Sequence, residues 1–291
     1  MHGEAVSRNF LRELVRPGSP NLDIVAVHGL NPFDTEFHAE QTWTTEGQLW
    51  LKDFLPQRLP RARVLLFGYN SNVAFRTSVS GVREQAENLL ARLKLARLEA
   101  PDRPILFICH SLGGIVVKRA LVDAAINVRF QDIRKATYGI VFFGTPHQGG
   151  NLIKLGSVAS KIVRAVLRQP SNSFLAALER DSLFADDLTR DFRHQLEDYH
   201  ILSFYESLPY GKLGVIVDRK SATLGLPGAR EQQIDTGSDH VDMCKFVSSD
   251  GDDYVLAIGC IGEIADSAVE DHQKRSSATS ENVPSTELTC M

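Results

Sequence analysis

The stretch Arg103-Pro-Ile-Leu-Phe-Ile-Cys-His-Ser-Leu-Gly-Gly-Ile-Val-Val-Lys118 decides the fold of this 291-residue chain. An apolar run of strand length ends in Cys-His-Ser-Leu-Gly-Gly, and a helical pattern leaves it at once. This order predicts a sharp strand-to-helix turn that lifts the hydroxyl of Ser111 out of a sheet. Gly113 and Gly114 let strand and helix pack closely, and the N–H of Leu112 at the helix start can stabilise a developing oxyanion.

The turn departs from the G-x-S-x-G pattern at its first position, where Cys109 stands in place of glycine. Cysteine is small enough for the turn to survive at some cost in strain. The alternative is a serine that stands by chance before a glycine-rich helix start. The preceding strand and the partner residues identified next favour a nucleophile at Ser111.

The remaining chain alternates between short apolar runs and helical periodicity. Five runs have the length and composition of buried strands, namely Asp23–His28, Val64–Tyr69, Ile105–Cys109, Tyr138–Phe143 and Ile201–Tyr205. Helical patterns lie between them, notably over Val82–Glu99 and Gly114–Ala125. The alternation predicts βαβ units and a mainly parallel central sheet flanked by helices. Together with the turn at Ser111, this pattern is typical of an α/β-hydrolase fold.

The predicted organisation has three parts. We expect an N-terminal extension over residues 1–20, one α/β-hydrolase domain over residues 21–267, and a disordered tail over residues 268–291 that is rich in Ser, Thr and charge. The connection over about residues 150–199 is far longer than a standard crossover and contains helix-like segments. It is interpreted as a helical, lid-like insertion.

Within this insertion, residues 151–169 place basic side chains at helical spacing. They are Lys154, Lys161, Arg164 and Arg168. One interpretation is a surface helix with a solvated basic side. The other is a lid whose apolar face covers the site and whose basic face meets anionic lipid head groups.

Composition limits the classes of function. Hydrophobic residues make up 43% and charged residues 23%, and the net charge is −4, which argues against a nucleic-acid partner. The four cysteines form no CxxC pair, so neither a zinc site nor a disulfide framework is expected. No signal sequence or membrane-spanning run is recognised, so we expect an intracellular, cytoplasmic protein without cofactor or metal.

A nucleophilic serine needs a histidine base that follows it in the chain. His240, in Ser-Asp-His-Val-Asp-Met-Cys-Lys-Phe, lies in a loop beyond the last predicted strands. His194 and His200 come too early, and His272 lies in the predicted tail. The acidic residues and the cysteine beside His240 permit a metal site, but no distant ligand motif accompanies them.

The acid that orients the base has two candidates. Glu206 ends the predicted strand Ile201–Tyr205, and Asp218 ends a second apolar run, Gly214-Val-Ile-Val-Asp218. We favour Glu206, because its strand would neighbour the one that ends at Gly144. Either carboxylate is otherwise a solvated loop residue.

The first predicted strand ends in Val27-His28-Gly29-Leu30, where the N–H of Leu30 is the second candidate oxyanion donor. Gly29 allows close approach of the backbone. His28 and His110 are interpreted as structural histidines, and His147 as a residue that orders a loop at the mouth of the site.

Six segments together resemble one group of proteins: VHGL, FGYNS, ICHSLGGIVVK, GIVFFGTPHQGG, LSFYE and DHVDMCKF. The chain is similar over roughly residues 20–265 to serine-active-site lipase-like α/β hydrolases. That group includes phospholipid-remodelling proteins of mitochondria and endoplasmic reticulum, and N-terminal hydrolase domains of fungal NOD-like receptors that carry NACHT or repeat segments. The resemblance implies a triad of Ser111, His240 and Glu206.

The predicted function is hydrolysis of carboxylic esters by a serine hydrolase, lipase- or esterase-like on lipid substrates. The resemblance extends the expected location to contact with mitochondrial or endoplasmic-reticulum membranes, as a peripheral protein. The alternative is a signalling module of the receptor type that keeps the fold without turnover. Nucleotide binding is disfavoured, since no G-x-x-x-x-G-K-[ST] sequence occurs.

Overall fold

The central feature of the computed structural model is a seven-stranded sheet in the order β1-β5-β2-β6-β7-β8-β9. The structure describes residues 9–30, 37–71, 79–147, 161, 188 and 190–281. The strands are β1 (Phe10–Val15), β2 (Leu22–Val27), β5 (Ala62–Gly68), β6 (Ile105–His110), β7 (Thr137–Phe143), β8 (His200–Tyr205) and β9 (Glu231–Asp235). All neighbours pair in parallel except β1 and β5, which are antiparallel. The predicted α/β class with a mainly parallel sheet is confirmed.

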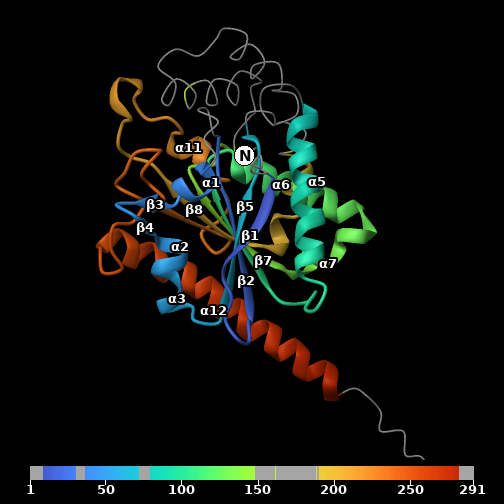
Figure 1. Cartoon of the computed structure of the whole chain (residues 1–291). Coiled ribbons are helices and arrows are strands. Elements are labelled where there is room, and N and C mark those ends of the chain that lie inside the picture. The colour runs from blue at the N-terminus through green and yellow to red at the C-terminus, as the bar shows by residue number, and fades with distance from the viewer. Residues whose placement is uncertain are drawn as a thin grey trace, which may run out of the picture.

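Helices cover both faces of this sheet (Figure 1). The longer ones are α5 (Val79–Ala96), α6 (Gly113–Ile126), α7 (Gln131–Ala136) and α12 (Asp252–Glu281). Short helical segments are α1 (His38–Gln41), α2 (Trp50–Asp53), α3 (Leu55–Arg58), α11 (Arg219–Ala222) and the 3₁₀ turns η1 (Val128–Phe130), η2 (Leu196–Asp198) and η3 (Gly211–Leu213). A small hairpin joins β3 (Thr44–Thr45) to β4 (Gln48–Leu49).

Alternate residues of each central strand enter two separate apolar cores. In β6, Phe107 and Cys109 face the core made with α5, α6 and α7, whereas Leu106 and Ile108 face the core made with α2, α3 and α12. Because both faces are buried, the strand reads as a continuous apolar run, as is typical of a covered parallel strand. That is why the five predicted strands agree with the structure to within two residues.

Two strands of the sheet lie outside those predictions. β1 falls inside the expected N-terminal extension, yet it pairs with β5, so residue 21 is not a boundary of the sheet. β9, with the sequence Glu-Gln-Gln-Ile-Asp, pairs with β8 at the opposite edge. Edge strands need only partial burial, so neither carries the apolar signature of the central strands.

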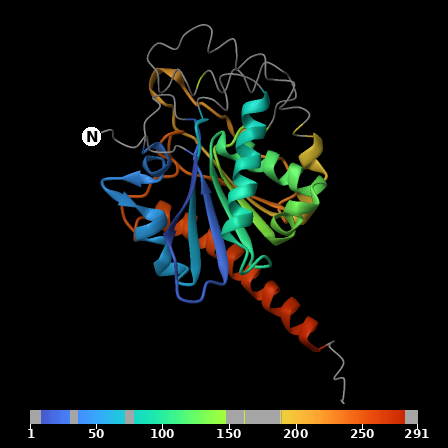
Figure 2. The same ribbon diagram turned by 45° about the vertical axis from the view of Figure 1, so that its right-hand side comes forward.

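The C-terminal helix also differs from expectation. α12 continues to Glu281, although disorder was predicted from residue 268. Its first half is anchored in the core by Tyr254, Ile261 and Ala265, among others. Propagation of an anchored helix needs no further nucleation, so polar residues can extend it. Its end projects beyond the body of the molecule (Figures 1 and 2).

Membrane crossing can be addressed for the described residues. No helix among them combines the length and the apolar character that a bilayer span requires.

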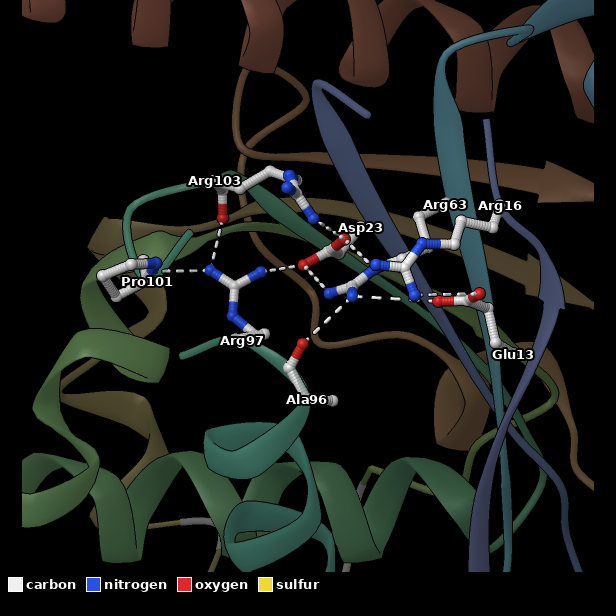
Figure 3. Close-up of polar contacts among 8 residues, drawn as sticks. All are labelled: Glu13, Arg16, Asp23, Arg63, Ala96, Arg97, Pro101 and Arg103. Atoms are coloured by element: carbon white, nitrogen blue, oxygen red, sulfur yellow. Dashed lines mark hydrogen bonds and ion pairs between the residues drawn. The ribbon is translucent and has the colours of Figure 1, made fainter. Parts of the chain in front are cut away.

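A buried ionic cluster lies at the amino ends of the strands (Figure 3). Asp23, fully buried at the start of β2, accepts a fork of two hydrogen bonds from Arg63 of β5 at 2.8 and 2.9 Å. Arg97 and Arg103 bond to the same carboxylate. The Arg97 guanidinium also donates to the carbonyl of Pro101 at 2.7 Å. One carboxylate thus ties together two strands, the end of α5 and the loop before β6.

This cluster generates a prediction about stability. Asp23→Ala should lower the free energy of unfolding by about 3–5 kcal/mol, because it leaves buried guanidinium groups without their shared counter-ion. The measurement is urea unfolding followed by circular dichroism. The matched control is Asp102→Ala, an exposed carboxylate nearby, with an expected change within about 0.5 kcal/mol. Equal effects of the two substitutions would contradict the role given to Asp23.

Candidate functional site

Ser111 occupies the turn between β6 and α6 in a strained backbone conformation. Its φ of 53° lies in the left-handed region, which costs a residue with a Cβ about 1–3 kcal/mol. Two hydrogen bonds hold the residue there. Its N–H donates to the carbonyl of Phe143 at 2.8 Å, and its carbonyl accepts from the Thr145 hydroxyl at 2.8 Å. The turn therefore depends on the end of β7 as well as on its own sequence.

Glycines allow the close packing that this turn requires. A Cβ at position 113 would lie 2.3 Å from the carbonyl oxygen of His28, and one at 114 would lie 2.3 Å from the Thr145 hydroxyl. A Cβ at Gly29 would lie 2.8 Å from the Cβ of Ser111. The two glycines after the serine, and the glycine after β2, are therefore needed because backbone segments approach one another around the hydroxyl.

The imidazole of His240 faces this hydroxyl. The distance from His240 Nε2 to Ser111 Oγ is 2.9 Å, and both residues are buried. Gly144, with φ of 58°, makes room for the ring, since a Cβ there would lie 3.1 Å from His240 Nδ1. The loop after β9 and the end of β7 together bring His240 against the serine.

A buried carboxylate lies on the other side of the same ring. Glu206 Oε1 is 3.1 Å from His240 Nδ1. The carboxylate also accepts the backbone N–H groups of Ile216, at 3.1 Å, and Val217. An acceptor on Nδ1 requires the hydrogen of the neutral ring to be there, which leaves Nε2 unprotonated toward Ser111. The arrangement is a hydrogen-bonded chain from carboxylate to imidazole to hydroxyl.

Asp218 does not enter this chain. It stands at the N-terminus of α11, where its carboxylate accepts the N–H of Ser221 at 2.8 Å, as a helix cap does. The apolar run Gly214–Asp218 does not form a strand. Gly214 has φ of 68°, and the N–H groups of residues 216 and 217 donate to Glu206 instead of to a strand neighbour. Because these N–H groups bind the Glu206 carboxylate, the apolar run does not pair with a neighbouring strand.

The two candidate oxyanion donors come from two segments that lie close to Ser111. Leu112 follows it at the start of α6, and Leu30 follows Gly29, whose backbone lies against Ser111. Among the described residues, neither N–H has a hydrogen-bond acceptor.

Of the expected structural histidines, His28 is held most completely. Its Nδ1 bonds to the carbonyl of Gly29 at 2.7 Å, and its Nε2 accepts the N–H of Tyr69 at 3.2 Å. Its ring stacks on Tyr69, with ring centres 4.3 Å apart. Burial lowers the pKa of His28 to about 3, so the ring is neutral at pH 7.

His147 is buried in the loop after β7, in contact with Lys118 of α6. Its backbone N–H donates to the carbonyl of Ser221 at 2.6 Å, and its ring atom Nδ1 lies 3.5 Å from the ammonium group of Lys118. Burial, and then the charge of Lys118, hold the pKa of His147 well below its usual value. Burial also lowers the pKa of Lys118 to about 8. These contacts tie the loop after β7 to α6 and α11, which agrees with a loop-ordering role.

Sequence reasoning missed the residues that support the site. Thr145 and Gly144 were seen only as part of a motif, and residues 216 and 217 only as part of the apolar run that ends at Asp218. Gly-Thr-Pro directly after an apolar run was the one available signal, since a glycine and a hydroxyl at a strand end often shape a turn. The backbone donors to Glu206 leave no mark in side-chain patterns.

The remaining candidate positions have ordinary surroundings where they are described. Cys109 is fully buried in β6, and burial raises the pKa of its thiol. Asp239 accepts the N–H groups of Val241 and Asp242 within its own turn, and Cys244 donates to the carbonyl of Thr42. Of the basic residues expected on one helix face, only Lys161 is described, exposed and in a helical conformation; the other three lie outside the described residues.

His28, buried directly after β2, predicts acid sensitivity. Because the pKa of His28 is about 3 in the folded state and 6.5 when unfolded, only the unfolded chain takes up a proton between these values. The stabilisation is complete above pH 6.5 and is lost as pH falls toward 3. At pH 5 the loss from this group is about 2 kcal/mol. Urea midpoints at pH 7 and 5 measure the loss, and an NMR titration of His28 near pH 6.5 would contradict the assignment.

Sequence comparison finds similarity to one kind of protein. No family model matches the chain. It is 31% identical to the zebrafish (Danio rerio) protein SERAC1 over 246 residues, which cover 77% of this chain and 36% of the relative. Human SERAC1 is 29% identical over 236 residues, which cover 77% of this chain and 34% of the relative. The chain therefore spans about a third of the length of these relatives.

Solved structures share its architecture. The mature Bacillus licheniformis lipase BlEst2 aligns with 81% of this chain and 92% of its own, with a TM-score of 0.54 and 17% identity. Esterase B from Lactobacillus rhamnosis aligns with 90% of this chain and 81% of its own, with a TM-score of 0.51 and 12% identity. Identities this low bear on the fold alone. Together with the sheet order and the turn at Ser111, they show that this chain is an α/β-hydrolase-fold protein.

Proposed function

We propose that the protein is a serine hydrolase that cleaves carboxylic esters through an acyl-enzyme. The observation that carries the proposal is the continuous chain from Glu206 through His240 to Ser111, with contacts of 3.1 and 2.9 Å. A hydroxyl is a weak nucleophile until a base accepts its proton, and a carboxylate holds that base in the correct tautomer. All three groups are buried, so water does not compete for these hydrogen bonds.

The first half of the proposed reaction forms the acyl-enzyme. Ser111 Oγ attacks the ester carbonyl carbon while His240 Nε2 takes its proton, and the carbonyl π electrons move onto oxygen. The N–H groups of Leu112 and Leu30 donate to this oxyanion. When the tetrahedral intermediate collapses, the ester C–O bond breaks and His240 returns the proton to the leaving alcohol.

The second half repeats these steps with water. His240 removes a proton from a water molecule, which attacks the acyl carbon, and the bond to Ser111 Oγ breaks as the serine regains a proton. Glu206 stays ionised throughout and stabilises the imidazolium that forms in each half. The products are a carboxylic acid and an alcohol, and no cofactor or metal takes part in any step.

A lipid ester is the substrate class we favour. The similarity to SERAC1 and the likeness in fold to a lipase and an esterase support a lipase- or esterase-like activity. In this proposal the segment around residues 150–199 is the lid of the site, and the protein meets membranes peripherally from an intracellular location. The competing function is a signalling module that has kept the fold without turnover.

Labelling with a fluorophosphonate separates these two functions. The wild type should be labelled at Ser111 and should hydrolyse p-nitrophenyl esters. Ser111→Ala should abolish labelling and lower kcat by several orders of magnitude while the melting temperature is kept, because only one hydroxyl is deleted. Ser221→Ala, outside the triad, is the matched control. A wild type that neither reacts with the probe nor turns over ester would favour the signalling module.

The choice of acid can be tested by a matched pair of amides. Glu206→Gln should lower kcat by about 10²–10⁴-fold, because an amide cannot stabilise the imidazolium and can hold the ring in the wrong tautomer. Asp218→Asn should leave kcat within about threefold, since asparagine caps a helix as well as aspartate does. Steady-state kinetics on one ester decides between them. A larger loss at Asp218 would reverse the assignment.

A further inference from the structure

His110, next to the serine in the chain, connects the two loops that bring the reacting groups together. Its Nε2 lies 2.9 Å from the backbone carbonyl oxygen of His240. On the opposite side of the ring, Nδ1 faces Gly29, where a Cβ would lie only 3.2 Å away. One imidazole therefore lies between the loop that carries the base and the loop that carries the Leu30 N–H.

These contacts determine the tautomer of His110. A carbonyl oxygen only accepts hydrogen bonds, so Nε2 carries the hydrogen and donates it to His240. In the neutral ring, Nδ1 then has no hydrogen and can lie close to the Gly29 backbone. His110 is the last residue of strand β6, so its ring donates this hydrogen bond from a position that the sheet fixes.

The position of the His240 carbonyl affects catalysis because this carbonyl belongs to the residue that acts as the base. The His240 ring makes two hydrogen bonds through its side chain, to Ser111 and to Glu206, and neither restrains the peptide that carries it. The N–H of that peptide, on Val241, is held by the Asp239 side chain within the same turn, and the bond from His110 ties the carbonyl of the peptide to strand β6. A displacement of about 1 Å in a reacting group can cost 10²-fold in rate, so a restraint on the backbone of the base has a direct effect on kcat.

The neighbouring rings do not compete for the proton. Their centres are 5.2 Å apart, so both cannot be cationic without strong repulsion. Burial and the nearby His240 hold the pKa of His110 well below its usual value. The proton taken from Ser111 therefore stays on His240, and His110 keeps its single hydrogen for the carbonyl.

We propose that His110 is a positioning residue for the ester hydrolysis described above. Its Nε2–H holds the backbone of His240 so that the ring of this base stays within hydrogen-bond distance of Ser111. This inference rests on the proposed function. It adds a residue outside the triad that acts through the position of His240. It also gives a role to the last residue of β6, which directly precedes the nucleophile.

Two amides of different length provide the test. In His110→Gln the side-chain NH₂ can reach the position of Nε2, whereas in His110→Asn it reaches only the position of Nδ1. His110→Gln should keep kcat within about fivefold of the wild type. His110→Asn and His110→Leu should lose about 10–100-fold in kcat with KM changed less than threefold. Melting temperatures of the two amide variants should agree.

Equal kcat values for the Gln and Asn variants, or a loss confined to KM, would overturn the proposal. Crystal structures of both variants add a readout independent of turnover. The contact between His240 Nε2 and Ser111 Oγ should be kept in His110→Gln and lengthened in His110→Asn. If the wild type proves inert toward ester and fluorophosphonate, the proposed function fails, and these two structures still decide whether His110 positions His240.

Discussion

The left-handed backbone at Ser111 is the constraint around which the rest of the site is arranged. A side chain in this conformation persists only where its surroundings hold it, and here both backbone groups of the residue are hydrogen-bonded to the end of β7. The elbow is therefore stable only in a sheet where β6 and β7 are neighbours. Its strain is balanced by tertiary contacts, and those same contacts hold the buried hydroxyl against His240.

The end of β7 supports both Ser111 and His240. Thr145 bonds to the carbonyl of Ser111, and Gly144 leaves the space that the His240 ring occupies. Because both residues follow the strand closely, any shift of β7 would move the supports of both side chains. The neighbouring strand β8 ends at Tyr205, and the next residue supplies the carboxylate. Three adjacent strand ends thus bring serine, histidine support and acid to one edge of the sheet.

Charged groups have a different role at the amino ends of the strands. Asp23 and its arginine partners hold together the amino ends of β2 and β5 and the loop into β6, away from the edge where these strands end at the candidate site. Ionic groups in that cluster have a structural role, whereas at the other edge a single buried carboxylate faces a histidine. The sheet separates these two roles because its strands, except β1, all run in the same direction, from the ends near Asp23 to the ends near Ser111.

The sequence by itself determined the central strands, the elbow and the identity of the serine and histidine candidates. Buried parallel strands must be continuously apolar, and the elbow needs glycines at fixed positions, so both leave local signals around Ser111. It left Glu206 and Asp218 as alternatives and gave no sign of β1 or β9. Only the tertiary structure distinguished the two carboxylates, because backbone N–H groups at 216 and 217 turn toward Glu206 while Asp218 caps α11. The same holds for His110, whose contact with the His240 carbonyl joins residues 130 positions apart, a separation that no local pattern encodes.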